Sequence, residues 1–482
     1  MKKITILAVL IFGVFFLLDR GAQAGLLDFF YTTKDKLAIE GNRVFFNGGP
    51  IVLSGVAVGD PYFRQTTYRR TAEDYKTISE EWQANTVRLS IHPSFVKDEK
   101  RVKKILEEEI ESARKNNLLV ILDYHVIGFP NSWFKPLDQP ESFSYDSNFK
   151  TAMDFWKYAA VKYRDDPGVI FELWNEPADK KERKWADLKP YMERLYSLIR
   201  SQGANNIIIS PGVYWSYDLR GTKGSPLSGK NIGYAWHNYP FSGKYLSWST
   251  ALDNLNEKYP VFVTEWGFSA DPSKRHFATL DAYGQPLKKL LKDKKLNFTA
   301  WCWHTPWDPR MFENNWTDLT PYGKFVKNFL SEIKAEEKFA ERVNDFITRG
   351  SDENSSRLGE GERRGAVNSF EAAFLRSPVS EEDLSDLLRI ANGLAPAQKS
   401  EQAENRAKNN FKLIYGRSPV MTNKNDALSI KIMAYGLRQK AGSRNLGYES
   451  SGVTTFKKIF RTLPKTCEHW NIVQAIAYSG AR

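Results

Sequence analysis

The chain has 482 residues, of which 41% are hydrophobic and 26% are charged, and its formal net charge is +12 at pH 7. This balance excludes an intrinsically disordered or a membrane-embedded protein and favours one large domain with a smaller one. The positive charge is spread along the sequence, without an arginine-rich arm or a nucleic-acid-binding motif. We therefore expect no nucleic-acid partner and interpret the charge as a solvated basic surface.

The first 24 residues have the pattern of an export signal. Lys2 and Lys3 precede the apolar run Ile4–Leu18, and Ala22-Gln23-Ala24 follows with the small-x-small pattern of a signal-peptidase site. An apolar run of this length is short for a helix that spans a bilayer. We expect cleavage after Ala24 and a protein that is secreted, periplasmic or on the cell surface. Retention of the segment as an anchor is the alternative.

Short apolar runs alternate with amphipathic helical segments between residues 37 and 330. The predicted strands are Ile51–Val58, Asn85–Ile91, Leu118–Tyr124, Gly168–Trp174, Asn206–Ser210, Ile232–Trp236, Pro260–Glu265 and Asn297–Trp303. Most lack polar alternation, which is typical of parallel strands buried on both faces. Eight such strands linked by helices predict an α/β fold, a (β/α)8 TIM barrel over residues 25–349. A doubly wound open sheet is the alternative, but no glycine-rich phosphate loop follows the first strand.

The last barrel helix is predicted to begin near Pro321 and to continue towards Phe346, and a polar, glycine-punctuated segment follows at 350–365. This composition is typical of a linker. The two cysteines, Cys302 and Cys467, fall on opposite sides of it, so we expect two unpaired thiols and no disulfide.

An internal repeat occupies residues 366–482. Phe370, Phe374, Arg376 and Pro378 recur as Phe411, Tyr415, Arg417 and Pro419, and more weakly as Phe456, Phe460 and Pro464. A helical segment follows each copy, and the period is 41 to 45 residues. We expect a smaller all-α domain of three stacked helix–turn–helix units.

Polar residues gather where the predicted barrel strands end, which is the end that carries the active site in TIM barrels. Four of the six histidines, His92, His125, His237 and His304, fall there. Arg88, Glu176 and Glu265 join them, and this convergence predicts a functional site. A metal centre is the competing use of the histidines, but no HxH or HExxH spacing is present, so we predict no metal and no cofactor.

Two strand-end motifs make the prediction specific: Phe171-Glu172-Leu173-Trp174-Asn175-Glu176-Pro177 and Val263-Thr264-Glu265-Trp266-Gly267. With them the chain resembles glycoside hydrolase family 5, the family of cellulases and mannanases, over residues 37–330. The resemblance implies a (β/α)8 barrel in which Glu176 is the acid/base and Glu265 the nucleophile. It also implies supporting or substrate-binding positions at Arg88, His125, His237, Tyr239 and Trp301, with Trp303 as the alternative to Trp301.

The residue types agree with that chemistry. Glycosidic bond hydrolysis needs one carboxyl group to protonate the leaving oxygen and one carboxylate to face the anomeric carbon. We expect Arg88 and the Tyr239 hydroxyl to keep Glu265 ionised, and the nearby negative charge to keep Glu176 protonated. Asn175 is expected to hydrogen-bond the sugar 2-hydroxyl.

Other residues near the strand ends are candidates for structural or sugar-binding roles. Strand alternation would place Glu172 on one face with Trp174 and Glu176, and we expect Glu172 to close a buried hydrogen-bond network. Exposed aromatic rings can stack on the apolar faces of sugars, and the candidates for such contacts are Trp133, Trp215, Trp236 and Trp307. His304 could contact sugar or shape its loop.

The expected substrate is a β-1,4-linked glucan. The Ser90-Ile91-His92-Pro93 and Asp123-Tyr124-His125 motifs look more like bacterial cellulases of the family than like its mannanases. We therefore predict a retaining endo-β-1,4-glucanase, with mannanase, xyloglucanase and β-1,3-glucanase as alternatives. A hypothesis of another class is a non-catalytic carbohydrate-binding surface protein.

The repeat domain is expected to localise or assemble the enzyme. From residue 351 the chain has 20 Lys and Arg against 14 Asp and Glu, so a basic surface is available for an anionic cell envelope or a protein partner. Trp470 is the single tryptophan there, which argues against an aromatic sugar-binding platform. The aromatic residues of the repeats are expected to form the core between helices.

Overall fold

The computed structural model describes residues 36–60, 70–93, 99–132, 147–179, 181–240 and 246–482. The chain divides into two compact units, Met1–Leu330 and Ser331–Arg482. The predicted export signal lies outside the described residues. Within the described ranges, no helix is both long enough and apolar enough to cross a membrane. Cys302 and Cys467 carry free thiols, one in each unit.

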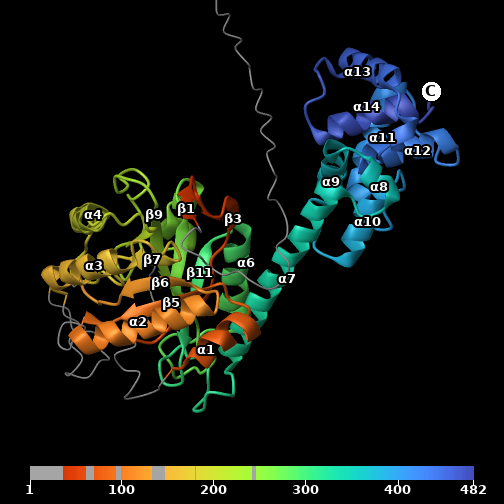
Figure 1. The fold of residues 1–482 in the computed structure, drawn as a ribbon. Coiled ribbons are helices and arrows are strands. Elements are labelled where there is room, and N and C mark those ends of the chain that lie inside the picture. The colour runs from red at the N-terminus through yellow and green to blue at the C-terminus, as the bar shows by residue number, and fades with distance from the viewer. Residues whose placement is uncertain (1–35, 61–69, 94–98, 133–146, 180, 241–245) are drawn as a thin grey trace, which may run out of the picture. The chain divides into compact units, whose positions relative to one another are not determined.

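Eight parallel strands close into a barrel in the first unit (Figure 1). They are β4 (Ser54–Val58), β5 (Thr86–Ile91), β6 (Leu119–Tyr124), β7 (Val169–Glu172), β8 (Ile208–Pro211), β9 (Ile232–Asn238), β10 (Val261–Trp266) and β11 (Asn297–Trp303). Their order around the barrel follows the chain, and β11 pairs with β4 to close the ring. Every residue of β5, β6, β9 and β10 is buried, which explains the continuous apolar runs. The predicted TIM barrel is confirmed.

Helices cover the outer face of the barrel (Figure 1). The helical elements of this part of the chain are α1 (Ala72–Lys76), η2 (Thr77–Glu81), α2 (Glu99–Lys115), α3 (Phe149–Tyr163), α4 (Trp185–Ser201), α5 (Trp248–Leu252), η4 (Leu255–Glu257), η5 (Leu280–Gly284), α6 (Gln285–Asp293) and the first part of α7 (Pro321–Arg349), which continues into the second unit. In α3, the Asn148 side chain caps the first turn, and Phe155, Trp156, Ala159 and Ala160 are buried. This spacing is the apolar stripe of a helix packed on a sheet.

A small antiparallel sheet closes the N-terminal end of the barrel. It consists of β1 (Leu37–Glu40), β2 (Arg43–Phe46) and β3 (Gly49–Ile51). Leu37 and Phe46 pack with residues near the starts of the barrel strands, such as Leu119 and Phe262. The opposite end of the barrel is therefore left for the site. Ile51 belongs to this sheet, so the first barrel strand begins later than the sequence predicts.

The second unit is helical. It contains α8 (Glu353–Arg357), α9 (Glu360–Phe374), α10 (Glu381–Ala391), α11 (Glu401–Tyr415), α12 (Lys424–Tyr435), η6 (Ala441–Ser443), α13 (Leu446–Phe460) and α14 (Cys467–Tyr478). The pairs α9–α10, α11–α12 and α13–α14 correspond to the three predicted repeats. The repeated aromatic pairs of α9, α11 and α13 contact within each helix, with ring centroids 4.5 to 4.6 Å apart.

The turns between the paired helices explain why the third repeat is weak in sequence. In the first two turns, Asp383 and Asp426 each accept a backbone N–H of the turn and pair with the repeated arginine. In the third turn, His469 accepts the backbone N–H of Lys465 at 3.2 Å. All three residues are the third of their helix. In each turn a backbone N–H thus finds a side-chain acceptor, but the acceptor in the third turn is a histidine and not an aspartate.

The predicted linker at 350–365 is wrong, because α8 and the start of α9 occupy it. The boundary between the compact units lies instead inside α7, between Leu330 and Ser331. A buried guanidinium explains why so polar a segment is ordered: Arg363 donates hydrogen bonds to the backbone carbonyls of Ile347, Thr348, Ser355 and Leu358. The Asp352 side chain also caps α8. Composition alone does not reveal these contacts.

Replacing Arg363 by alanine should destabilise the second unit by about 3 kcal/mol, because it leaves several buried carbonyls without donors. Arg364→Ala is the matched control, since Arg364 is exposed and pairs with Glu360 along one helix face. The control should change stability by less than about 0.5 kcal/mol. Chemical unfolding followed by circular dichroism measures both. Equal stability of the two variants would contradict the structural role of Arg363.

Candidate active site

Arg88 of β5 lies at the centre of a polar network inside the barrel, and its side chain is fully buried. Its Nε donates to Glu172 Oε2 at 2.6 Å and its Nη1 to Glu265 Oε1 at 2.8 Å. Its Nη2 donates to Asn175 Oδ1 at 2.8 Å and lies 2.9 Å from Asp123 Oδ2. One guanidinium therefore fixes side chains from three other strand ends.

Glu265 of β10 is held as a carboxylate. Its second oxygen, Oε2, accepts a hydrogen bond from the Tyr239 hydroxyl at 2.8 Å. Burial raises the pKa of Glu265, but the charges of His237, Arg88 and His125 and the Tyr239 hydrogen bond together lower it below its ordinary value. Burial also raises the pKa of Tyr239 well above its usual range, so this hydroxyl remains a donor.

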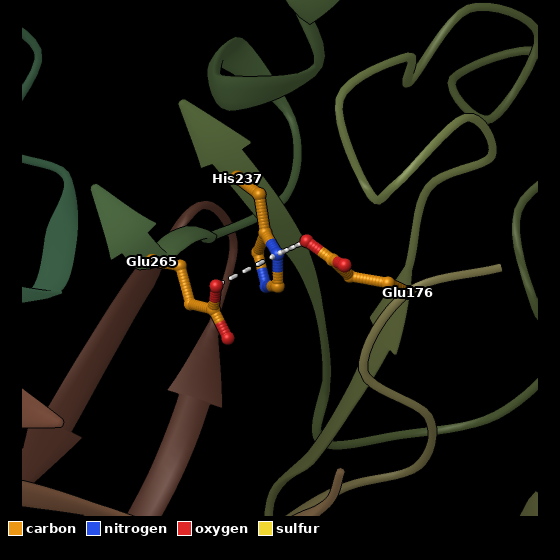
Figure 2. A group of neighbouring side chains, drawn as sticks. All are labelled: Glu176, His237 and Glu265. Atoms are coloured by element: carbon orange, nitrogen blue, oxygen red, sulfur yellow. Dashed lines mark hydrogen bonds and ion pairs between the residues drawn. The ribbon is translucent and has the colours of Figure 1, made fainter. Parts of the chain in front are cut away.

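The pKa of Glu176, just beyond β7, is shifted in the opposite direction. Burial and the charge of Glu265 raise its pKa, although a hydrogen bond with His237 opposes them. Figure 2 shows His237 between the two carboxylates: its Nδ1 lies 3.0 Å from Glu176 Oε1 and 3.6 Å from Glu265 Oε2. One oxygen of each carboxylate and a His237 nitrogen all lie within 4.8 Å of one another. The two carboxyl groups thus face one space with different proton affinities.

His237 is fixed from three sides. Its Nε2 lies 3.1 Å from Thr264 Oγ1, and its backbone N–H donates to the carbonyl of Ser216. Burial lowers the pKa of His237, but Glu265, Glu172 and Glu176 outweigh this effect and raise it to about 10. The imidazole is therefore a cation at neutral pH.

The loop after β8 holds the residues on either side of Glu176. Tyr214, Trp215 and Ser216 have φ values of 56°, 55° and 56°, a left-handed conformation that costs free energy for non-glycine residues. The Ser216 hydroxyl donates to the carbonyl of Asn175 at 2.5 Å, and the Trp215 N–H donates to the carbonyl of Pro177. This loop therefore fixes the backbone on both sides of Glu176.

A row of stacked rings lies beside the carboxylates. His125 stacks on Trp301 with centroids 5.3 Å apart, and Trp301 lies parallel to Trp307 at 6.2 Å. His125 Nδ1 bonds Asp123 Oδ2 at 2.7 Å, which sets the plane of the imidazole. Trp303, in contrast, is buried and packs against the ring of Trp82. Of the two alternatives, Trp301 is the one that joins the site.

Several other residues that the sequence places near the site do not join these stacked rings and carboxylates. Trp236 is fully buried and donates its indole N–H to the carbonyl of Tyr217, so its prediction as a sugar platform is wrong. His304 is buried against Trp307, and burial lowers its pKa to about 3. His92 is also buried, and its backbone N–H bonds Asp60. Trp133 lies outside the described residues.

Two features of the strands were not foreseen. β7 ends at Glu172, so Trp174 leaves the barrel interior and packs against Phe149 of α3, contrary to the predicted shared face. The pairing of β9 and β10 shifts register before Glu265. Consecutive residues Thr264 and Glu265 therefore both reach His237. Alternation would place only one of them inside, which is why Thr264 was missed.

Glu176, His237 and Glu265 are close enough to suggest a metal centre, but their hydrogen bonds fit one poorly. Both Glu265 oxygens already accept hydrogen bonds, one of them from a guanidinium. A further cation at this point would lie beside Arg88 and against the charge of His237. The donor set suits proton transfer better than metal binding.

Comparisons with known proteins cover the barrel. The family model described as cellulase, glycosyl hydrolase family 5, matches residues 46–306. Endoglucanase A of Butyrivibrio fibrisolvens is 27% identical over 242 residues, 48% of this chain and 52% of that protein. An endoglucanase of Clostridium saccharobutylicum is 28% identical over 306 residues, 58% of this chain and 61% of that protein. The chain spans about half the length of the first of these relatives.

Solved structures show the same architecture. The β-glucanase SdGluc5_26A of Saccharophagus degradans, solved in complex with cellotetraose, is 27% identical, with a TM-score of 0.57 over 63% of this chain and 95% of that one. The catalytic domain of the Thermobifida fusca endoglucanase Cel5A, at 22% identity and a TM-score of 0.52, covers 61% of this chain and 97% of that one. The second likeness supports the barrel fold alone.

Proposed function

The chain belongs to glycosyl hydrolase family 5, the cellulase family, and on this basis we propose that it is a retaining endo-β-1,4-glucanase. The observation that carries the proposal is the pair Glu176 and Glu265. Their oxygens approach within 4.8 Å, and their pKa values are shifted in opposite directions. Close spacing suits a double displacement, and unequal pKa values suit one acid and one nucleophile.

In the first step, a carboxylate oxygen of Glu265 attacks the anomeric carbon and forms a glycosyl ester. The glycosidic bond breaks as Glu176 gives its proton to the leaving oxygen. Arg88 and Tyr239 hold the carboxylate in place, so little reorganisation is needed during attack.

In the second step, a water molecule attacks the ester and restores the configuration at the anomeric carbon. Ester formation removes the negative charge of Glu265, one of the causes that raise the pKa of Glu176. Glu176 then ionises more readily and accepts the proton from water as the new bond forms. The same group thus acts as acid and as base.

Support for a β-glucan substrate comes from the relatives and from the rings beside the site. The relatives are named endoglucanases, and one neighbouring structure holds cellotetraose. The half-buried Trp301 and Trp307 form an aromatic surface next to His125, suited to the apolar faces of sugar rings. Asn175 Nδ2 is buried without a hydrogen-bond partner among the described residues, and a sugar 2-hydroxyl would satisfy it.

The substrate assignment is tested by release of reducing sugar from four soluble polysaccharides. We expect the highest kcat/KM on carboxymethylcellulose, and lower values on glucomannan, xyloglucan and laminarin. A preference for one of the other three would replace the glucanase assignment by the corresponding activity. Absence of product from all four, with a folded protein, would favour the non-catalytic carbohydrate-binding hypothesis.

Export and the role of the repeats belong to the proposal as well. The N-terminal segment favours a cleaved signal peptide and a secreted, periplasmic or surface location. We propose that the repeat domain, residues 366–482, localises the enzyme at a cell envelope or on a protein partner, supported by the excess of Lys and Arg over Asp and Glu from residue 351 onward.

Glu265→Ala should lower kcat on carboxymethylcellulose by several orders of magnitude and leave the barrel folded, because this carboxylate is placed for the reaction and Arg88 keeps Asp123 and Glu172 as partners. Azide can enter the space left by the side chain and attack from the same face. The expected product is an α-configured glycosyl azide, identified by proton NMR. A variant that retained full activity would exclude Glu265 as the nucleophile.

Glu176→Ala should lose activity unequally on different leaving groups. Natural glucans need a proton on the leaving oxygen, so their hydrolysis should fall by at least about 100-fold. Aryl cellobiosides with acidic phenols need less protonation, and their first step should fall less. Burst kinetics with dinitrophenyl cellobioside separates the two steps. An equal loss on both substrates would count against Glu176 as the acid.

A further inference from the structure

Thr264 connects the site histidine to a second buried carboxylate. Its hydroxyl donates to Glu172 Oε1 at 2.8 Å, and Thr264 Oγ1 itself lies 3.1 Å from His237 Nε2. On the other side of the ring, His237 Nδ1 faces Glu176 Oε1 at 3.0 Å. Four groups on two strands and the β7 end thus form the chain Glu172–Thr264–His237–Glu176. All four are buried or nearly so.

The direction of these hydrogen bonds follows from the donors available. Burial raises the pKa of Glu172, but Arg88 and the contacts with His237 lower it to about 2, so Glu172 is a carboxylate that only accepts. The hydroxyl of Thr264 has one hydrogen, and Glu172 accepts it. Thr264 Oγ1 must therefore accept the remaining bond, and its donor is the N–H at His237 Nε2.

This order has a consequence for the other ring nitrogen. With Nε2 always carrying its hydrogen, the imidazole can gain or lose a proton only at Nδ1. That nitrogen faces Glu176, the group proposed to give and take the proton of the reaction. Resting on the proposed function, we propose that Thr264 is a positioning residue that fixes the hydrogen on His237 Nε2 and so directs Nδ1 to the acid/base Glu176.

Other charged groups around His237 do not supply this constraint. Glu265 of β10 and Glu176 both face Nδ1, and Tyr239 contacts Glu265 rather than the ring. Arg88 of β5 and His125, just after β6, lie against Glu265 Oε1 rather than against the ring of His237. Glu172 itself is 3.7 Å from Nε2, beyond a good hydrogen bond. The hydroxyl of Thr264 is the group that bridges this gap.

The test compares Thr264→Val, which keeps the shape of the side chain and removes the hydroxyl, with Thr264→Ser, which keeps the hydroxyl. Without an acceptor at Nε2 the imidazolium is less stable, so the pKa of His237 falls. Loss of the proton removes a positive charge beside Glu176, and the ionised form of Glu176 is then less stable. The alkaline limb of kcat/KM for an aryl cellobioside should therefore move to higher pH by about one unit in Thr264→Val, the equivalent of one hydrogen bond.

Thr264→Ser should keep the limb at the wild-type position even if its overall rate falls. An unshifted limb in Thr264→Val, or an equal shift in Thr264→Ser, would overturn the proposal, because the hydroxyl would then have no special effect. A uniform fall in rate across the pH range in Thr264→Val would overturn it too, since loss of packing alone gives that result.

A second measurement needs no activity and separates this proposal from the proposed function. In the full chain labelled with 15N-histidine, the His237 signals are identified by their loss in His237→Gln. With rising pH, Nδ1 should change its 15N shift strongly and Nε2 little in the wild type, whereas both should change in Thr264→Val. Identical titrations of the two proteins would exclude the role of Thr264. Inactivity of the wild type on all glucans, with the expected NMR difference, would exclude only the glucanase assignment.

Discussion

The burial of one guanidinium is the constraint on which the site depends. Arg88 has no access to solvent and lies within 3 Å of oxygens of Asp123, Glu172 and Glu265. A buried charge is tolerated when it is paired and hydrogen-bonded, and removal of one partner leaves the others uncompensated. The three carboxylates exceed the charge of Arg88, and the cationic His237 offsets part of the excess. The geometry of the site is therefore held by electrostatics between strands.

The different behaviour of the two proposed reacting carboxylates follows from this arrangement. Glu265 is buried and Glu176 is largely so, and burial alone would raise both pKa values. Glu265 accepts hydrogen bonds from Arg88 and Tyr239, whereas Glu176 has only His237 as a hydrogen-bonding side chain among the described residues and has the charge of Glu265 nearby. The number of donors on each carboxylate decides which one is ionised. Burial and the charge of Glu172 together raise the pKa of Asp123 to about 6, even beside Arg88.

The sequence predicts the barrel and most of the site because both depend on local patterns. Continuous apolar runs identify the strands, and strand-end motifs place Glu176 and Glu265 at one rim. Thr264 could not be predicted, because a register shift between two strands turns it inward. The prediction of Trp236 as a sugar platform was wrong for a related reason: the burial of its side chain depends on the layer of helices outside the strand. Such properties arise from pairing and packing between distant segments, which periodicity does not record.

The incorrect linker prediction for residues 350–365 also results from contacts between distant segments. The partners of buried polar residues differ between the two units. In the helical unit, buried polar groups such as Arg363, Asp383 and Asp426 bond backbone atoms at helix ends and turns. Their hydrogen-bonding capacity is used to satisfy the fold. In the barrel, Arg88 and Glu172 bond other side chains, and those side chains present Glu176 and Glu265 to a common space. A buried polar residue therefore points to chemistry when its partners are side chains from several strands, and to structure when its partners are backbone atoms.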